Sequence, residues 1–196
     1  ESEATSIDIT GLDTSNVTIF SNFAYGCLNL THITGLSDLD GSKATTLVSA
    51  FRNCKVLDFG AGATTNFGSD WGPNLGLVGG FNSAFEQVGY TTPGSTPPDV
   101  ADWDVSGATS MSNMFYKCQW TGGGDIDTSA WEIPSSCNTL VSFARECSTT
   151  KIDFSDTNCN LSAVTTMANF ARDASNFTRF ILHGSSDLGA CTNFSN

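Results

Sequence analysis

Basic residues are scarce in this chain. It has 8 lysines and arginines against 20 aspartates and glutamates, so its formal net charge at pH 7 is −12. Nucleic-acid binding requires a basic surface that neutralises phosphates, and attachment to an anionic membrane surface has the same requirement. The composition therefore argues against nucleic acid and against an anionic membrane as partners.

Long hydrophobic runs are missing as well. No stretch of about 18 apolar residues occurs, so the sequence predicts no transmembrane helix and no membrane insertion. The chain starts at Glu1 without a methionine and ends at Asn196 inside a sequence repeat, so we expect a processed part of a longer polypeptide. Abundant serine and threonine with little lysine favour an extracellular location, on a cell surface or a virion surface.

Motifs of known catalytic and metal chemistry are also absent. The sequence has no HExxH, P-loop or GxSxG motif and no Ser-His-Asp set. It has no CxxC pair, and His32 and His183 stand alone, which argues against zinc. We therefore expect no enzyme activity and no cofactor. Two alternatives stay open: a carboxylate pair for glycoside hydrolysis, and weak binding of Ca²⁺ by aspartate oxygens.

What the chain does have is a sevenfold internal repeat. An apolar residue marks position zero of each copy: Val17, Ala44, Val78, Ala108, Cys137, Val164 and Leu188. Mostly apolar residues follow at offsets of 3, 6, 7 and 10. Neighbouring copies are between 24 residues (Val164 to Leu188) and 34 residues (Ala44 to Val78) apart. A period in this range predicts stacked supersecondary units.

The repeat predicts one domain over residues 1–196, because each copy buries its apolar stripe only against its neighbours. We place the copies at 5–29, 30–54, 55–88, 89–118, 119–147, 148–174 and an incomplete 175–196. The offsets lie on one side of a helix, with a 3₁₀ helix as an alternative. Alternating segments at 7–9, 31–33, 57–59, 126–127 and 152–154 predict strands. The expected fold is an α/β repeat solenoid of strand, turn and short helix, leucine-rich-repeat-like, with a parallel sheet on one face.

Four of the seven cysteines share offset 10, namely Cys27, Cys54, Cys118 and Cys147. Val88 and Ala174 fill the same column in other copies, so these cysteines behave as small buried hydrophobes. A disulfide requires Cα atoms within about 7 Å, and we expect outer helices to lie farther apart. The sequence predicts mostly free, buried thiols.

Two other columns have a narrow composition. The pair at offsets 6 and 7 combines Phe with Ala or Ser in every copy except Met114-Phe115, which keeps the side-chain volume of the pair nearly constant. Offset 5 is Asn or Ser in every copy, from Asn22 to Asn193. That uniformity suggests a local hydrogen-bonding role between helices.

One copy carries a recognisable signature. Residues 103–118 read Trp-Asp-Val-Ser-Gly-Ala-Thr-Ser-Met-Ser-Asn-Met-Phe-Tyr-Lys-Cys, and 13–17 with 23–27 form a second good match. This pattern resembles the repeat of BspA-type leucine-rich-repeat-like bacterial surface proteins, and through its period the resemblance covers nearly the whole chain. It implies an extracellular, non-catalytic module for adhesion or protein binding. The other copies are degenerate.

Outward-facing columns are the candidate binding residues. The centre of the expected strands holds Asp8, His32, Asp58, Asp99, Asp127 and Asp153. Stacked about 4.8 Å apart, these carboxylates would repel one another unless solvent or a cation intervenes. They form either a stripe that binds a cation or a basic partner, or a solvated edge that prevents aggregation.

Offset 8 holds the second candidate column. Its members are Tyr25, Arg52, Glu86, Tyr116, Arg145 and Arg172. Tyrosine and arginine are enriched at protein interfaces, although long side chains also cover structure with their stems. Trp120, in an irregular stretch before a triple glycine, is a candidate exposed aromatic.

These features favour a surface recognition or adhesion module that binds a protein or a cell-surface glycan through its repeat surface. The alternative is a structural or receptor-binding subunit of an assembled particle or fibre, such as a virion appendage or decoration protein, which contacts other subunits. The two differ in whether the chain binds a separate ligand or self-associates.

Overall fold

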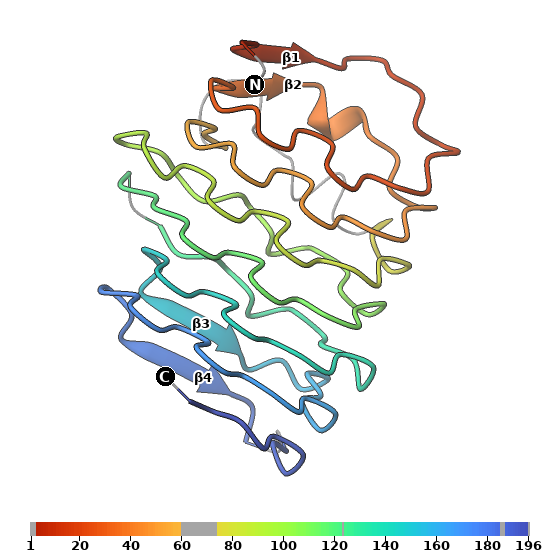
Figure 1. Cartoon of the computed structure of the whole chain (residues 1–196). Coiled ribbons are helices and arrows are strands. Elements are labelled where there is room, and N and C mark those ends of the chain that lie inside the picture. Colours follow the sequence, from red (N-terminus) through yellow and green to blue (C-terminus); the bar gives the residue numbers. More distant parts are fainter. Residues whose placement is uncertain (1–2, 60–73, 123, 185–186, 196) are drawn as a thin grey trace.

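The structure is a computed structural model that describes residues 3–59, 74–122, 124–184 and 187–195 (Figure 1). Its regular elements are short. β1 (Ser6–Asp8) pairs in parallel with β2 (His32–Thr34), and β3 (Lys151–Phe154) pairs in parallel with β4 (Arg179–Leu182). A 3₁₀ helix, η1 (Leu36–Asp38), follows β2. Turns, single bridges and irregular segments make up the rest of these ranges.

The predicted α/β solenoid of strand, turn and short helix is wrong. Among the described residues there is no α-helix, and the helical element η1 is a single turn of 3₁₀ helix. Both sheets have two strands, so no continuous parallel sheet covers one face of the part described. Two of the expected strands, at 57–59 and 126–127, do not form.

The repeats lie side by side in parallel register (Figure 1). Single parallel bridges join offset 2 of each copy to the same offset of the next, through Ile19, Thr46, Gly80, Ser110, Thr139, Thr166 and Asn193. The sequence repeat is therefore also a repeat in space, held by backbone hydrogen bonds between neighbouring copies.

The register corrects the alignment of the last copy. Asn193 bridges to Thr166, and the Cys191 N–H donates to the carbonyl of Leu188 (2.9 Å), as the Val164 N–H donates to that of Leu161 (3.0 Å). Position zero of the seventh copy is therefore Cys191 rather than Leu188. Its distance from Val164 (191 − 164) becomes 27 residues, equal to that of the first step from Val17 to Ala44.

The segment between offsets 3 and 10 is a run of tight turns. In the first copy the N–H groups of Phe23, Tyr25 and Cys27 each donate to the carbonyl three residues earlier at 3.2 Å. The N–H groups that alternate with them donate instead to the second copy, for example Ala24 to the carbonyl of Ala50 (2.7 Å). Alternate N–H groups therefore close turns within a copy and tie neighbouring copies together.

Left-handed backbone explains the uniform column at offset 5. Its described members in the first six copies have φ between 53° and 59°: Asn22, Ser49, Ser83, Asn113, Ser142 and Asn169. Offset 9 repeats this with φ between 54° and 71°, at Gly26, Asn53, Gln87, Lys117, Glu146 and Asp173. Positive φ at the third residue is typical of type II turns, where Gly and Asn are favoured. Bonding between helices, the expected role of offset 5, is wrong because the structure has no helices there.

The buried columns at offsets 3, 6, 7 and 10 are confirmed in the second to fifth copies, where they build an aromatic core. Some members are half-buried in the first and sixth copies, such as Phe23 and Ala171, and Phe194 in the seventh is exposed. Phe51, Phe85 and Phe115 share offset 7 and stack in parallel, with ring centroids 5.5 and 5.4 Å apart. Where the ring moves to offset 6, at Phe143, the contact with Phe115 becomes edge-to-face at 81°. Phe143 then stacks on Phe170, again at offset 6 (5.5 Å). The exchange of large and small residues thus decides ring geometry along the stack.

Candidate functional site

The offset 8 residues form a strip along the surface, which we call the Tyr/Arg strip: Tyr25, Arg52, Glu86, Tyr116, Arg145 and Arg172. The first three make one contact group. The Arg52 guanidinium lies over the Tyr25 ring at 5.9 Å and pairs with Glu86 at 3.1 Å. Tyr25 remains 49% exposed, whereas Glu86 is buried. The structure therefore brings these side chains together as expected from their shared offset.

A second contact group lies in the fourth and fifth copies. Arg145 and Lys117 both approach the Tyr116 ring at 5.3 Å, and both pair with Glu146, at 3.2 and 3.5 Å. Arg172 pairs with its neighbour Asp173 at 3.3 Å. These contacts hold the side chains in place while they stay partly exposed. The strip is therefore an ordered surface of aromatic and cationic groups.

The expected aspartate column is not a ladder. In the parallel register Asp8 lies opposite Thr34, and His32 lies opposite Ser6, so Asp8 and His32 are not neighbours in one column. Asp153 is 9% exposed, so the expectation that it points into solvent is wrong. Asp8, Asp99 and Asp127 are exposed, whereas His32 and Asp58 are half-buried.

Each of these carboxylates is engaged by the backbone nearby. Asp8, Asp99, Asp127 and Asp153 each accept a hydrogen bond from the N–H two residues later, at 3.0 to 3.3 Å. Asp58 accepts two from Thr96. The hydroxyl and N–H of Ser129 hold the pKa of Asp127 below its ordinary value, and the N–H of Thr10 does the same for the pKa of Asp8. These bonds give the column a role in shaping turns.

Trp120 is not the exposed aromatic that we predicted. It is 3% exposed and packs edge-to-face against Phe115 at 6.2 Å. Its backbone N–H donates to the Ser148 hydroxyl at 2.8 Å. Trp120 therefore belongs to the core rather than to a ligand platform.

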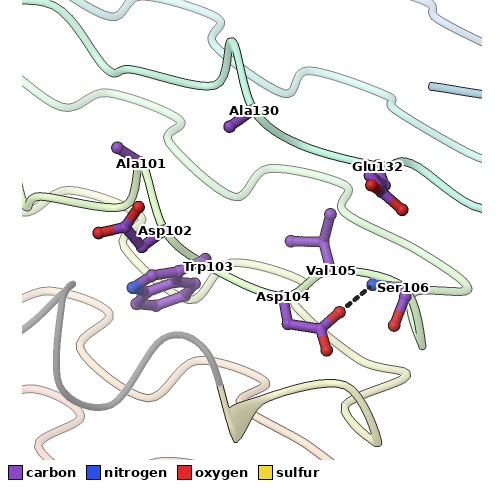
Figure 2. A pocket seen from close by; sticks show the side chains of 8 residues that line it. All are labelled: Ala101, Asp102, Trp103, Asp104, Val105, Ser106, Ala130 and Glu132. Carbon is purple, nitrogen blue, oxygen red and sulfur yellow. Dashed lines mark hydrogen bonds between the residues drawn. The ribbon is translucent and has the colours of Figure 1, made fainter. Parts of the chain in front are cut away.

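An open depression of about 550 Å³ brings three acidic residues to one place, which the sequence had not indicated (Figure 2). Asp102, Asp104 and Glu132 line it, with the buried Trp103 beside them. Asp104 accepts a hydrogen bond from the Ser106 N–H (2.9 Å), and Glu132 accepts one from the Asn158 amide (2.8 Å). Within the described ranges, no three His, Cys, Asp or Glu side chains form a group that could hold a metal ion.

Asp104 belongs to a further column that sequence reasoning missed. Four residues before position zero, Asp or Asn accepts a hydrogen bond from the N–H two residues later, at 2.6 to 3.0 Å, in Asp13, Asp40, Asp104, Asn160 and Asp187. The signal was present as Asp-x-Ser or Asn-x-Ser at a constant distance from position zero in the first four of these copies, with Gly189 in place of the serine in the last. This column, like the first, caps turns.

All seven cysteines are free, and five of them are buried. Burial raises the pKa of Cys54 and Cys147 to about 12. The thiols of Cys54 and Cys118 donate to carbonyls of the preceding copy, Ala24 at 3.0 Å and Phe85 at 2.8 Å. The free thiols agree with the prediction, but its reason was wrong. In the ranges that the structure describes, no α-helix separates the copies, which are joined by backbone hydrogen bonds.

The fold and these surfaces define a protein of stacked short repeats. The chain belongs to the family described as "Mycoplasma protein of unknown function, DUF285", whose model matches residues 81–193. That description assigns no activity to the family. No curated protein and no solved structure matches the chain. No helix in the part of the chain that the structure describes has the length and apolar character needed to cross a membrane.

Proposed function

We propose that this chain is a non-catalytic recognition and adhesion module on an extracellular surface, and that it binds a protein partner through the Tyr/Arg strip. The observation that carries the proposal is the strip itself. It presents partly exposed tyrosines and arginines in an order fixed by cation–π contacts and ion pairs.

Composition and preorganisation both support this role. Tyrosine and arginine are the residue types that most often dominate binding energy at protein interfaces. Because Arg52 and Arg145 are already held against Tyr25 and Tyr116, less side-chain entropy is lost when a partner binds. The resemblance of residues 103–118 to BspA-type surface repeats points to the same class of function.

The acidic depression supports the non-catalytic part of the proposal. A glycoside hydrolase needs one carboxylic acid that is kept protonated by apolar surroundings. Asp102 and Glu132 are both exposed to solvent at the rim of an open depression. Neither carboxyl group has the apolar enclosure that a general acid of this kind requires.

The first experiment locates the protein, by immunogold electron microscopy on the cells that make it and on particles they release. The second measures saturable binding of fluorescently labelled chain to the surface that carries the label. The Tyr116→Ala/Arg145→Ala variant should weaken binding at least about tenfold, because interface hot spots of these types contribute 2 kcal/mol or more each.

A matched control uses the same residue types outside the strip. Tyr90 and Arg179 are exposed and have no place in offset 8. The Tyr90→Ala/Arg179→Ala variant should bind as the unmodified chain does. Equal binding by both double variants would remove the strip from the proposal, and binding that never saturates would remove the recognition function.

A second candidate function is a structural or receptor-binding subunit of a particle or fibre. The observation that favours it is apolar surface in the last two copies, where Phe177, Phe180 and Leu182 are half-buried and Phe194 is 51% exposed. Other subunits could cover these side chains. Sedimentation velocity at increasing protein concentration tests this candidate. Self-association supports it, and a monomer throughout argues against it.

A further inference from the structure

Three columns that lie within four positions of one another in every copy carry no charge. Offsets 1, 2 and 4 together form what we call the neutral face. Offset 1 holds Thr18, Thr45, Gly79, Thr109, Asn138, Thr165 and Thr192. Offset 2 holds Ile19, Thr46, Gly80, Ser110, Thr139, Thr166 and Asn193. Offset 4 holds Ser21, Val48, Asn82, Ser112, Val141, Ala168 and Ser195.

None of these residues is charged, and none is buried. Charged residues make up 14% of the chain, so three complete columns would be expected to contain several. Solubility alone would favour charges at exposed positions. The neutral face is therefore a distinct surface, made of hydroxyl, amide and methyl groups.

The hydroxyl groups on this face are held in fixed positions. The side chains of Thr45, Thr109 and Thr165 donate to the carbonyl of the residue at offset 1 of the preceding copy, at 3.0, 2.8 and 3.1 Å. Between offsets 4 and 2, the hydroxyls of Ser112 and Thr139 are hydrogen-bonded at 3.1 Å. Since the rotamers are already fixed, a ligand loses little side-chain entropy on binding.

The composition of the face separates it from the Tyr/Arg strip. It contains no Tyr, Trp or Arg, and Ser, Thr and Val are under-represented among the residues that dominate protein interfaces. An anionic ligand would be repelled by the net charge of −12, and a cationic ligand finds no carboxylate on this face. The remaining chemistry is a neutral ligand that is itself rich in hydroxyl groups.

The spacing of the copies indicates the repeat distance of a matching ligand. Parallel bridges join the offset 2 residues of neighbouring copies, which places equivalent groups about 4.8 Å apart. In an extended β-1,4-linked polysaccharide, each pyranose unit lengthens the chain by a comparable distance. Successive sugars lying along the columns would therefore meet equivalent side chains in successive copies.

From these observations we infer that the neutral face is a second binding surface, distinct from the Tyr/Arg strip, for an extended, uncharged, β-linked polysaccharide. Sugar hydroxyls donate to the hydroxyl oxygens of Thr45, Thr109 and Thr165, whose own hydrogens are engaged by carbonyls, and sugar C–H groups contact the methyl groups. The inference does not depend on the protein partner proposed for the strip, because the two surfaces share no residue.

The test is depletion of the whole chain from solution by suspended cellulose and by suspended chitin. Both particles should bind the chain, and added sodium chloride should leave the binding unchanged because no ion pair is involved. Soluble dextran, which is neutral and α-linked, should not compete, nor should anionic alginate. If the chain binds neither particle, or if added salt abolishes the binding, the inference is overturned.

Two matched variants locate the surface. Thr109→Glu/Thr165→Glu places two carboxylates on the neutral face and should weaken binding at least about tenfold, since each would have to be desolvated by a neutral ligand. Thr31→Glu/Thr178→Glu is the control. Thr31 and Thr178 are exposed and their hydroxyls make the same bond to the preceding copy, at 2.8 and 3.1 Å, but in another column.

The control should bind as the unmodified chain does, with an equal loss of thermal stability in both variants. If both double variants lose binding equally, or neither does, the neutral face is not the site. If the Tyr116→Ala/Arg145→Ala variant no longer binds cellulose, the polysaccharide binds the Tyr/Arg strip instead. That result would overturn the inference about the neutral face but would still identify the strip as a binding surface.

Discussion

At the scale of single residues, backbone conformation explains more of this sequence than side-chain contacts do. Asn113 has a φ of 58° and Lys117 one of 58°, although neither is a glycine. Left-handed backbone costs most residues roughly 1–2 kcal/mol, and asparagine tolerates it best after glycine. Neighbouring copies enforce this geometry, since the Asn113 N–H donates to the Val141 carbonyl at 2.9 Å.

This conformation predicts the order of stability of two substitutions at Asn113. Asn113→Gly should change the free energy of unfolding by less than about 0.5 kcal/mol, whereas Asn113→Ala should lower it by about 1 kcal/mol more. Urea denaturation measures both. At Asn138, whose φ is not positive, the order should reverse because glycine is there the less favourable residue. A helix at offset 5 would instead make Asn113→Ala the more stable variant.

The burial of the thiols predicts their reactivity. Only the thiolate reacts rapidly, and burial raises the pKa of Cys54 and Cys147 to about 12. At neutral pH these two should react with a disulfide reagent only as fast as the protein unfolds. Cys27 and Cys191, which are half-buried, should react first. Time-resolved mass spectrometry of labelled peptides measures the order, and rapid labelling of Cys147 in the folded protein would contradict it.

At the scale of elements, the spacing of apolar residues predicted the buried columns but not the backbone that carries them. Phe20, Phe23 and Ala24 point inward in a run of i to i+3 turns, as they would on a helix. Offsets of 3 and 4 residues are common to both structures, so periodicity alone does not distinguish them. The distinguishing signal was Asn or Ser at offset 5, because those residues favour positive φ and are poor helix formers.

The candidate site shows the same division. Shared offsets correctly placed Arg52 beside Tyr25 and Arg145 beside Tyr116, because equal positions in stacked copies are neighbours. Strand alternation failed for Asp153, which is buried. The alignment of Asp8 with His32 failed because strand register depends on loop length, which differs between copies. The predicted exposure of Trp120 was wrong because the residues that cover it come from other copies. One of them is Gly89, where an added Cβ would lie 2.8 Å from the indole.

The aromatic column is the element whose removal should be most damaging. Phe85 is fully buried between Phe51 and Phe115. Phe85→Ala should lower the free energy of unfolding by about 3–5 kcal/mol, because a cavity remains in a core that both neighbours fill. Tyr90→Ala, nearby in sequence and 46% exposed, should cost less than about 0.5 kcal/mol. Urea denaturation monitored by circular dichroism compares them, and similar losses would contradict the stacked core.

At the scale of the whole molecule, acidic residues are hydrogen-bonded to the backbone of turns along the stack. Asp13 and Asp40 accept bonds from the N–H groups of Ser15 and Ser42, and the hydroxyls and N–H groups of those serines lower the pKa of each carboxyl. Such capping recurs in most copies, so the net charge of −12 is distributed over turns along the stack. The acidic composition is therefore part of how the copies fold.

Acidification should accordingly destabilise the protein. A carboxyl whose pKa is lower in the folded than in the unfolded state contributes stability above the unfolded pKa, and the contribution is lost as pH falls through the folded pKa. Asp8, Asp13, Asp40, Asp125 and Asp127 all have lowered pKa values. The thermal unfolding midpoint should therefore fall as pH drops below about 4, near the ordinary aspartate pKa.

Relief of charge repulsion acts in the opposite direction, because protonation reduces the net charge, so a variant is needed to isolate the local bonds. Asp125 accepts hydrogen bonds from the Thr150 N–H (2.6 Å) and from the hydroxyls of Thr150 (2.8 Å) and Thr149 (3.1 Å). Burial raises the pKa of Asp125, but these hydrogen bonds together outweigh it, so the pKa is lower than its ordinary value. Asp125→Asn should lower the unfolding midpoint at pH 7 and should narrow the difference between pH 7 and pH 3. An equal or larger difference in the variant would show that the bond to Asp125 does not control the acid response.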